Sequence, residues 1–276
     1  MGKQDTGGTQ SLDRAIDLLR IVASRTGRGV RFSDVVARSD LSKATVHRLL
    51  QALERHGLIA HDPAARLYHL GPEAFVIGTL AAERHGIHRV ALPSLTRLAF
   101  ASQDTAFLSV RRDWQSVCVH REEGGFPIRS HVLQAGDRHP LGLGAGSLAM
   151  LAALPDDEIE AVLVQARPEI DALCPRYTAT ELDQAIARTR TLGYALNPGL
   201  LEAESWGVGV AVLDLQGRCQ AALSISAIQS RLSSEARQRE LAALLREEAR
   251  RLADRLGRPN GASDLVSRAV REAAAA

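Results

Sequence analysis

The spacing of apolar residues in and after the stretch LSKATVHRLL constrains the fold more than any other feature of this sequence. These residues recur at the interval of one helix face, at Val46, Leu49, Leu50 and Leu53. Ser42 stands just before them in the position of an N-cap, and Gly57 follows as a residue that ends helices. The pattern therefore predicts a helix over residues 42–56 with one buried face and one polar face.

Shorter patterns on both sides place this helix in a small domain. Helices are expected over residues 11–23 and 33–38, and a three-residue turn with Leu41 as its apolar residue leads from the second of these into helix 42–56. The stretches LIAH and LYHL follow as two short strands, separated by DPAAR, whose Asp-Pro start is typical of a turn. Three helices followed by a hairpin indicate a winged helix-turn-helix, which we expect over residues 8–71.

Such a domain explains the polar face of helix 42–56. The second helix of a helix-turn-helix lies in the major groove of DNA, with its N-terminal residues at the base edges. Arg can bind guanine through two hydrogen bonds, Thr can contact a thymine methyl group, and Lys suits phosphate. The residues expected to contact DNA are Ser42, Lys43, Thr45, His47 and Arg48 in the helix and Arg66 at the hairpin tip. A face that is merely solvated is the alternative.

The charge distribution favours DNA binding. The first 72 residues contain 11 Lys and Arg against 7 Asp and Glu, whereas the other 204 residues contain 23 against 25. A basic excess confined to one part of a chain is typical of a small module that faces nucleic acid.

The remaining composition indicates a cytoplasmic protein without a metal or a cofactor. No apolar run reaches the length of a membrane-spanning helix, and the N-terminal MGKQDTGGTQ lacks the apolar core of a secretory signal. Cys118, Cys174 and Cys219 are isolated and odd in number, which indicates free thiols in a reducing compartment. No Cys/His cluster has the spacing of a zinc site.

The chain after residue 71 is expected to form a linker and a larger α/β domain. A linker helix is expected over residues 72–88, and the domain over residues 89–257 begins with a further helix and three strand-like runs, TAFLSVRR, SVCVHREE and PIRSHVL. Three helices follow, then the strands GVGVAVLD and CQAALSISA, and then a long helix. Strands flanked by helices at both ends indicate a largely antiparallel sheet. The tail over residues 258–276 has few large apolar residues and is expected to be mobile.

Over almost its whole length the chain resembles the IclR family of bacterial transcriptional regulators. The matching segments are SLDRAIDLLRIV, FSDVVARSDLSKATVHRLLQALERHGLI, YHLG, GDRHPLGLGAGSLAMLA, RTLGYALN and GVGVAVLDLQGRCQAALSIS. The resemblance implies an α+β protein of two domains: an N-terminal winged helix-turn-helix, a linker helix and a C-terminal GAF-like domain that binds a small-molecule effector. It also implies a homodimer that often pairs again into a homotetramer.

The resemblance also places the effector pocket. The lining would come from the loop HPLGLGAG that opens a helix, from the strand after GY, and from the last two strands. The candidate effector-binding residues are Gly144, Ala145, Asn197, Trp206, Gly207, Ser224 and Ser226. Asn197 stands where an acid is common in the family, Gly207 stands where Cys or Ser is frequent, and Trp206 would fill the space beside Gly207. These departures predict a ligand different from that of better-known members.

The residues themselves support an anion site at this place. Gly142, Gly144 and Gly146 expose backbone N–H groups at the start of a helix, where unpaired donors and partial positive charge favour anions. Ser224 and Ser226 alternate along a strand, so both hydroxyls can point into one cavity. We therefore expect a small carboxylate as the effector. In the alternative interpretation the glycines only permit close packing.

The competing class is a metabolite-processing enzyme, or a GAF-like sensor, that uses the glycine-rich loop GLGAG. This loop lacks the GxGxxG and GxxxxGK[ST] spacings, and Ser147, with His131 or His139 near it, lacks the GxSxG elbow of a nucleophile. His85 and His88 can share a helix face but have no third metal ligand. We expect no catalytic residues.

Sequence-specific binding requires two copies of the DNA-binding domain, because one recognition helix contacts too few bases. We expect a homodimer, or a dimer of dimers, on a pseudo-palindromic operator in double-stranded DNA. The sequence leaves open which effector and operator are bound, and whether the protein represses or activates.

Overall fold

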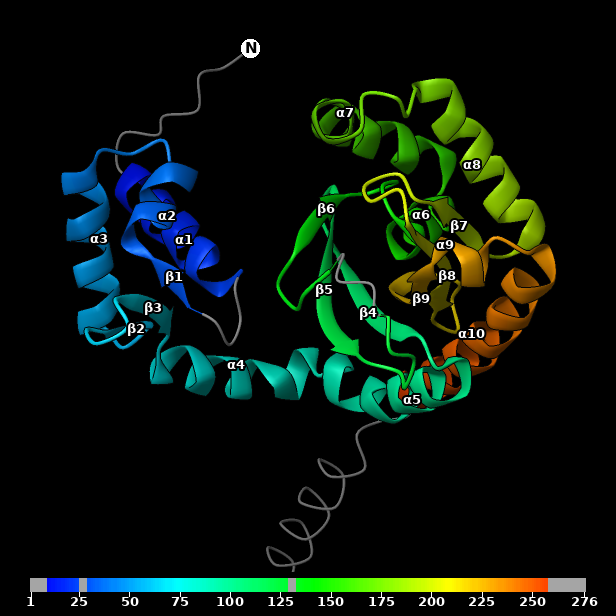
Figure 1. The fold of residues 1–276 in the computed structure, drawn as a ribbon, viewed down its shortest axis with the longest axis horizontal. Coiled ribbons are helices and arrows are strands. Elements are labelled where there is room, and N and C mark those ends of the chain that lie inside the picture. Colours follow the sequence, from blue (N-terminus) through cyan, green and yellow to red (C-terminus); the bar gives the residue numbers. More distant parts are fainter. Residues whose placement is uncertain (1–8, 25–28, 129–132, 258–276) are drawn as a thin grey trace, which may run out of the picture. The chain divides into compact units, whose positions relative to one another are not determined.

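The computed structural model describes residues 9–24, 29–128 and 133–257, apart from the side chains of residues 82–85. These residues form two compact units. The first unit comprises the chain up to Gly86 together with Gln134–Asp137, and the second comprises Ile87–Leu133 and the chain from Arg138 onward. Figure 1 shows the helices and strands of both units.

The first unit is the predicted winged helix-turn-helix. Its helices are α1 (Gln10–Ala23), α2 (Phe32–Arg38) and α3 (Lys43–Arg55). Its antiparallel sheet has the order β1-β3-β2 and consists of β1 (Val30–Arg31), β2 (Ile59–Asp62) and β3 (Leu67–Leu70). The sequence predicted each of these elements except β1, which is too short to show a periodic pattern.

A small apolar core holds the first unit together. The three helices and three strands named above all contribute to it, and its buried members include Leu18, Val22, Val30, Val35, Val46, Leu50, Ile59 and Tyr68. Ser42 caps α3 as predicted, since its Oγ accepts a hydrogen bond from the Thr45 N–H at 3.3 Å. Without this bond the first turn of α3 would leave one more N–H group unpaired.

Helix α4 (Pro72–His85) continues from β3 and is fixed to the first unit at its start. The Gly71 N–H donates to the Leu58 carbonyl at 2.9 Å, and the Glu73 N–H donates to the Gly57 carbonyl at 3.0 Å. Helix α5 begins at Ile87, so the segment predicted as a linker contains the whole of α4 and the start of α5.

Beyond its first turn, α4 is an apolar helix with exposed side chains. Phe75 is 76% exposed and Leu80 is 69% exposed, and Val76 and Ile77 between them are also exposed. Apolar residues thus occur on several sides of this helix, a composition that is normally found in buried helices.

The second unit is built on an antiparallel sheet of six strands in the order β6-β5-β4-β9-β8-β7. The strands are β4 (Thr105–Arg112), β5 (Gln115–Glu122), β6 (Arg138–Pro140), β7 (Ala195–Pro198), β8 (Ser205–Leu213) and β9 (Cys219–Ile228). The helices are α5 (Ile87–Ser102), α6 (Ala145–Ala152), α7 (Asp156–Leu173), α8 (Ala179–Leu192), α9 (Gln229–Leu232) and α10 (Glu235–Leu256).

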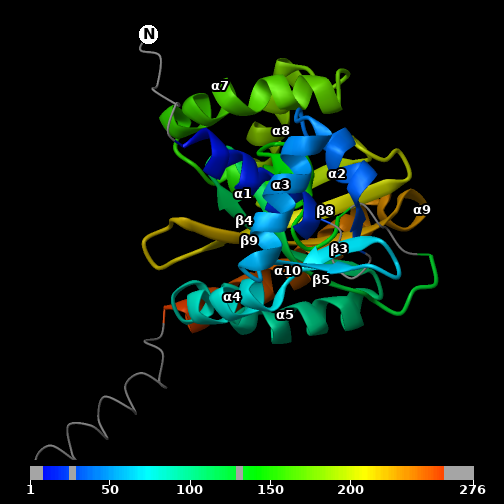
Figure 2. The same ribbon diagram turned by 90° about the vertical axis from the view of Figure 1, so that its left-hand side faces the viewer.

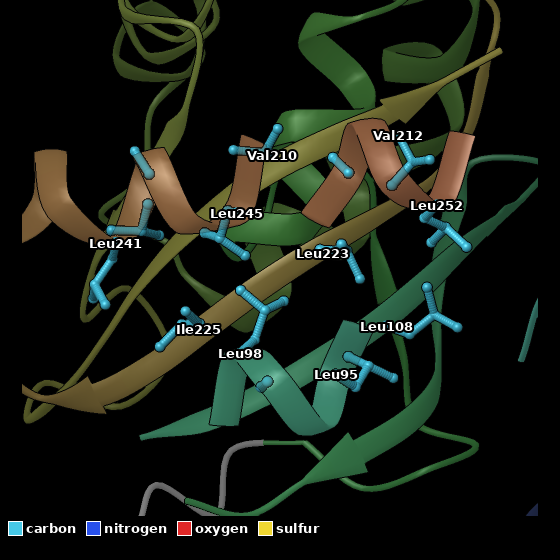
Figure 3. Packing of buried hydrophobic residues seen from close by; sticks show 14 of the residues in the cluster. Leu95, Leu98, Leu108, Val210, Val212, Leu223, Ile225, Leu241, Leu245 and Leu252 are labelled. Carbon is cyan, nitrogen blue, oxygen red and sulfur yellow. The ribbon is translucent and has the colours of Figure 1, made fainter. Parts of the chain in front are cut away.

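The central strands of this sheet have two different faces, because successive side chains point to opposite sides. On the first face, large apolar side chains pack against α5 and α10 (Figure 3). The strand residues labelled there are Leu108, Val210, Val212, Leu223 and Ile225. The helix residues that meet them are Leu95, Leu98, Leu241, Leu245 and Leu252. On the second face the same strands carry small residues, among them Ser109, Gly207, Gly209, Ala222, Ser224 and Ser226. Helix α6 packs on this small-residue face, and α7 and α8 lie on the same side of the sheet (Figure 1 and Figure 2).

The structure corrects the sequence analysis at the edges of the sheet. The segment PIRSHVL was expected to be a strand, but Pro127 and Ile128 are not in one, and residues 129–132 lie outside the described residues. The edge strand β6 was not predicted, because it is very short and contains a proline. The other edge strand, β7, is the strand after GY that the family resemblance implied. The predicted tail over residues 258–276 also lies outside the described residues. Within the described ranges, no helix has the length and hydrophobicity that crossing a membrane requires.

Candidate functional site

The polar side of α3 faces solvent in the first unit. Its buried side consists of Val46, Leu49, Leu50 and Leu53. With about 3.6 residues per turn, the positions opposite this side are Ala44, Arg48, Gln51 and Arg55, and all are exposed. We call these residues the α3 outer face. Lys43 and His47 are exposed beside it.

Two of the residues expected to contact DNA also have local roles. Thr45 is half-buried, and its hydroxyl oxygen lies 3.0 Å from that of the capping Ser42. The His47 ring meets the Phe32 ring edge-on, with the ring centroids 6.2 Å apart. Thr45 therefore lies next to the buried side of α3 rather than on the outer face. Ala44 and Gln51 were not among the residues expected on the polar face of this helix. Their helix angles relative to Val46 are the signal that indicates them.

The hairpin between β2 and β3 presents Arg66 to solvent. Asp62 Oδ1 accepts hydrogen bonds from the N–H groups of Ala65 at 3.0 Å and Ala64 at 2.9 Å, which tightens the turn. The bond from Ala65, with a smaller contribution from Ala64, holds the pKa of the Asp62 carboxyl below its ordinary value. Arg66 adopts a left-handed backbone conformation, with φ of 57°, at the end of this turn.

A cavity lies between α6 and the small-residue face of the sheet in the second unit. Its volume, measured as the space open to the centre of a water molecule, is about 50 Å³. The structure brings six of the predicted effector-binding residues together around it, namely Gly144, Ala145, Asn197, Gly207, Ser224 and Ser226. One water needs roughly 10–15 Å³ in this measure, so the cavity suits a few waters or one small molecule.

Trp206 is not among the described residues that line this cavity. It stands between Ser205 and Gly207 on β8, so its side chain points to the opposite face of the sheet. There it packs against the apolar cluster beneath α5 and α10. The expectation that Trp206 fills the space beside Gly207 therefore does not hold, because the side chains of two adjacent strand residues point to opposite faces.

Glycines allow the start of α6 to approach β8 at backbone distance. A Cβ atom added to Gly209 would lie 2.5 Å from the carbonyl carbon and oxygen of Ala145 and 2.8 Å from the nitrogen of Gly146. At Gly207 the nearest atom would be the Ala145 Cβ, at 3.2 Å. Gly144 turns the chain into the helix with φ of 98°, a conformation that favours glycine. The helix N-terminus is thus seated directly on the sheet.

This N-terminus presents backbone donors at the cavity wall. The first hydrogen bond of α6 runs from the Leu148 N–H to the Gly144 carbonyl at 2.8 Å. The N–H groups of Ala145, Gly146 and Ser147 precede it and have no partner within the helix. These three residues all line the cavity.

Polar side chains add further donors. Asn197 Oδ1 accepts a hydrogen bond from the Leu200 N–H at 3.1 Å, which leaves the amide NH₂ group of Asn197 to donate. The hydroxyls of Ser109, Ser116 and Ser224 have no hydrogen-bond partner among the described residues. No Asp, Glu, Lys or Arg occurs among the described lining residues. The described lining is therefore uncharged apart from any proton on a lining histidine. It contains several hydrogen-bond donors without a protein acceptor.

The serine considered as a nucleophile has a structural role. Ser147 Oγ donates to the Pro140 carbonyl at 2.9 Å and accepts from the Gly142 N–H at 3.1 Å. These bonds close the glycine-rich loop onto the first turn of α6. The hydroxyl proton of Ser147 is thus directed at a carbonyl oxygen rather than at a base.

The histidines considered as metal ligands do not form a site in the described residues. His88 Nε2 lies 2.9 Å from His120 Nδ1, so His88 interacts with β5. Burial, and to a lesser degree the neighbouring His120, lower the pKa of His88. The side chain of His85, like all of His131, lies outside the described residues. Across the ranges that the structure describes, no three His, Cys, Asp or Glu residues are grouped as a metal site.

Several lining residues of the cavity were not found from the sequence, among them Phe107, Ser109, Ser116, His139, Leu201 and Ser205. Ser109 and Ser205 occupy alternate positions in strands whose other residues are apolar, and this alternation would have indicated them. His139 lies on β6, which is too short to give a pattern.

Comparison with known proteins places both units in one family. A family model described as "IclR helix-turn-helix domain" matches residues 11–63, and one described as "Bacterial transcriptional regulator IclR C-terminal" matches residues 79–254. The DNA-binding transcriptional repressor YiaJ of Escherichia coli (strain K12) is 30% identical over 261 residues, which are 92% of this chain and 90% of YiaJ.

Two solved structures show the same fold. The IclR transcriptional regulator from Alicyclobacillus acidocaldarius has a TM-score of 0.73 and 25% identity, over 89% of this chain and 98% of its own. An IclR homolog from Microbacterium hydrocarbonoxydans, complexed with 4-hydroxybenzoate, has a TM-score of 0.69 and 22% identity, over 88% and 98%.

We predict that Gly209→Ala destabilises the second unit more than Gly207→Ala does. The new methyl group at 209 must displace the backbone of α6, and overpacking of this kind costs about 1–3 kcal/mol, whereas at 207 it meets only a side-chain methyl. Denaturant unfolding of the full chain, followed by circular dichroism, measures both. Equal stability of the two variants would show that α6 is free to shift and that the close approach is not a constraint.

Proposed function

Because the chain belongs to the IclR family of bacterial transcriptional regulators, we propose that it binds an operator sequence-specifically and that a small carboxylate in the second unit controls this binding. One observation carries the proposal for the effector: a small cavity without charged residues in its described lining, into which the N-terminus of α6 presents free backbone donors. The protein would act in the cytoplasm, where its DNA lies.

A carboxylate suits this cavity better than a cation or a neutral apolar molecule. Backbone N–H groups at a helix N-terminus bind anions without a basic side chain. The amide of Asn197 and the hydroxyl of Ser224 can donate to further oxygens of the ligand. An acid at position 197 would repel a carboxylate, and this chain has none there. The small volume favours acids of two to four carbons.

The solved neighbour that contains 4-hydroxybenzoate shows that a protein of this fold can hold a small carboxylate. Because its identity to this chain is low, the likeness extends to the fold only and does not assign the same ligand to the cavity described above. The proposal therefore rests on the donors and the size of the cavity.

The α3 outer face is the proposed DNA-reading surface. Arg48 stands at its centre, with Ala44 one turn before it and Gln51 one turn after it. Arg can bind guanine, Gln can bind adenine, and Ala can contact a thymine methyl group, so these residue types can read a base sequence. Lys43 and Arg66 are placed to meet phosphates at the two sides, and Ser42, Thr45 and His47 flank the face.

A homodimer through α4 is part of the proposal. Its exposed apolar side chains are best explained by a second copy of the same helix, since a two-fold axis pairs one patch with itself. Such a dimer presents two α3 helices, as a pseudo-palindromic operator requires. Pairing of two such dimers would give the homotetramer.

Control of DNA binding then follows from linkage. An effector that binds one arrangement of the dimer better than another shifts the population toward it by its differential affinity. DNA must in turn change the affinity for the effector by the same factor.

The first prediction concerns DNA reading. Arg48→Ala and Gln51→Ala should each lose about 1–3 kcal/mol of discrimination at one base pair, whereas Lys43→Ala should weaken binding to all sequences and lower the salt dependence by about one phosphate contact. Selection from random DNA followed by salt titration measures both effects. Arg239→Ala, on the exposed surface of α10, is the control. Wild-type specificity in Arg48→Ala would refute the assignment of the outer face.

The second prediction concerns the dimer. Burying a Phe or Leu side chain contributes about 1.5–3 kcal/mol, so Phe75→Ser combined with Leu80→Ser should raise the dimer dissociation constant at least about 100-fold. Analytical ultracentrifugation of the full chain measures it. Leu215→Ser removes an equally exposed Leu from the β8–β9 turn, 80% exposed, and should change nothing. An unchanged dimer in the double variant would place the interface elsewhere.

The third prediction concerns the effector. Asn197→Asp keeps the acceptor for the Leu200 N–H but replaces a donor by a charge, so it should weaken a small carboxylate at least about tenfold without unfolding the unit. Ala145→Glu should block the cavity. A thermal-shift screen of two- to four-carbon monocarboxylates identifies the ligand, and calorimetry then compares the variants. Gln216→Glu adds the same charge at the exposed turn as a control. Tighter binding to Asn197→Asp would mean a neutral, donor-rich ligand instead.

A further inference from the structure

A second and larger hollow lies along the free edge of the sheet, between α8 and β7. Its volume, in the same measure as above, is about 310 Å³, which is within the range of small-molecule sites. Leu148 from α6, Ala185 from α8, and Leu196, Pro198 and Leu200 from β7 and the loop after it give it an apolar floor. We call this hollow the α8–β7 groove. All its lining residues belong to the second unit.

Tyr177 supplies a hydroxyl that is free to bind a ligand in this groove. Its side chain lines the groove and the residue is only 5% exposed, yet its hydroxyl has no hydrogen-bond partner within the described ranges. Burial, with a smaller contribution from the Glu181 charge, raises the pKa of Tyr177, so the phenol stays protonated and can donate. The hydroxyl is therefore free to donate a hydrogen bond to an acceptor on a ligand in the groove.

Arg188 supplies a charge at the other end. It stands seven residues after Glu181 on α8, which is about 10 Å along the helix axis. Arg188 has no ion-pair or hydrogen-bond partner in the part of the chain that the structure describes. The carboxylate of Glu181, in contrast, is occupied by the capping box, with Thr178 N–H and Oγ at 2.7 and 2.8 Å. The groove therefore has an acidic end, where Glu181 lies near Tyr177, and a basic end, where the Arg188 charge has no partner among the described residues.

The groove and the effector cavity share two walls. On β7, Asn197 lines the cavity while its neighbours Leu196 and Pro198 line the groove. On α6, the first turn lines the cavity while Leu148 lines the groove. The hydrogen bond from Leu200 N–H to Asn197 Oδ1 links a residue of one to a residue of the other.

We propose that the α8–β7 groove is a second ligand site, for a monocarboxylate with an apolar, ring-sized body and a polar atom at its far end. The carboxylate binds Arg188, the body lies on the leucine floor, and the far polar atom accepts from the Tyr177 hydroxyl. Through β7 and α6, occupancy of the groove changes the affinity of the effector cavity, and the effect is reciprocal. The binding site itself stands whether or not the cavity takes the proposed effector.

Methyl NMR of the full chain with 3-(4-hydroxyphenyl)propanoate tests the site. Ala185 lines the groove and Ala145 lines the effector cavity, so their methyl signals report on the two places separately. The probe should shift the Ala185 signal in the wild-type protein. A shift confined to Ala145, or no shift at millimolar probe, overturns the proposal. Either result leaves the test of the effector cavity with Asn197→Asp unaffected.

Calorimetry with the same probe tests the two polar contacts. Arg188→Gln should weaken binding at least about tenfold, and Tyr177→Phe, which keeps the ring, about threefold or more. The neutral analogue 3-(4-hydroxyphenyl)propan-1-ol should bind the wild type weakly and be insensitive to Arg188→Gln. Arg255→Gln, at the exposed end of α10, is the control and should bind as the wild type does. Equal affinity of wild type and Arg188→Gln for the carboxylate would refute the proposed contact.

Discussion

The backbone contact between Gly209 of β8 and the first turn of α6 determines what the second unit can bind. Because neither side has room for a side chain there, the helix N-terminus lies against the sheet itself. Its unpaired N–H groups consequently open onto a wall of serines and glycines rather than onto bulk solvent. The same contact keeps the cavity small. The kind and the size of the proposed effector are both argued from this one approach of backbone to backbone.

The sheet also determines how a bound ligand can act on the rest of the unit. The strands β4, β8 and β9 present hydroxyls and glycines to the cavity on one face and interlocked large apolar residues to α5 and α10 on the other (Figure 3). Close-packed protein interiors transmit strain between the elements that they join. A ligand that moves a strand therefore moves α5, the helix with which the second unit begins.

The sequence predicted those parts of the molecule that have a repeating pattern. The periodicity of Val46, Leu49 and Leu50 was enough for α3, and alternation along β8 and β9 was enough for the center of the sheet. Strands of two or three residues, such as β1 and β6, have no period to detect. Their position depends on pairing with partners distant in the chain, which local patterns do not contain.

The sequence predicted a site residue correctly where it also indicated the direction in which the side chain points. The resemblance placed Asn197 and Ser224 at the cavity, and the structure brings them together there. Trp206 was misplaced because its neighbour Gly207 faces the cavity, and strand neighbours face opposite ways. Thr45 was expected on the polar face of α3 because it is polar, although its helix angle puts it beside the buried side. The α8–β7 groove had no local signal, since it forms only where α8 and β7 come together and Leu148 of α6 joins them.

The alternation along the strands has a consequence for how such a protein can diverge. Substitutions at cavity positions such as Ser109, Ser224 and Ser226 change the chemistry offered to a ligand, while the intervening residues that secure folding stay as they are. Specificity and stability are therefore encoded in interleaved but separate sets of positions. A lineage built on this sheet can explore new ligands by single small steps without passing through unfolded intermediates, and its ligand preference is expected to drift faster than its architecture.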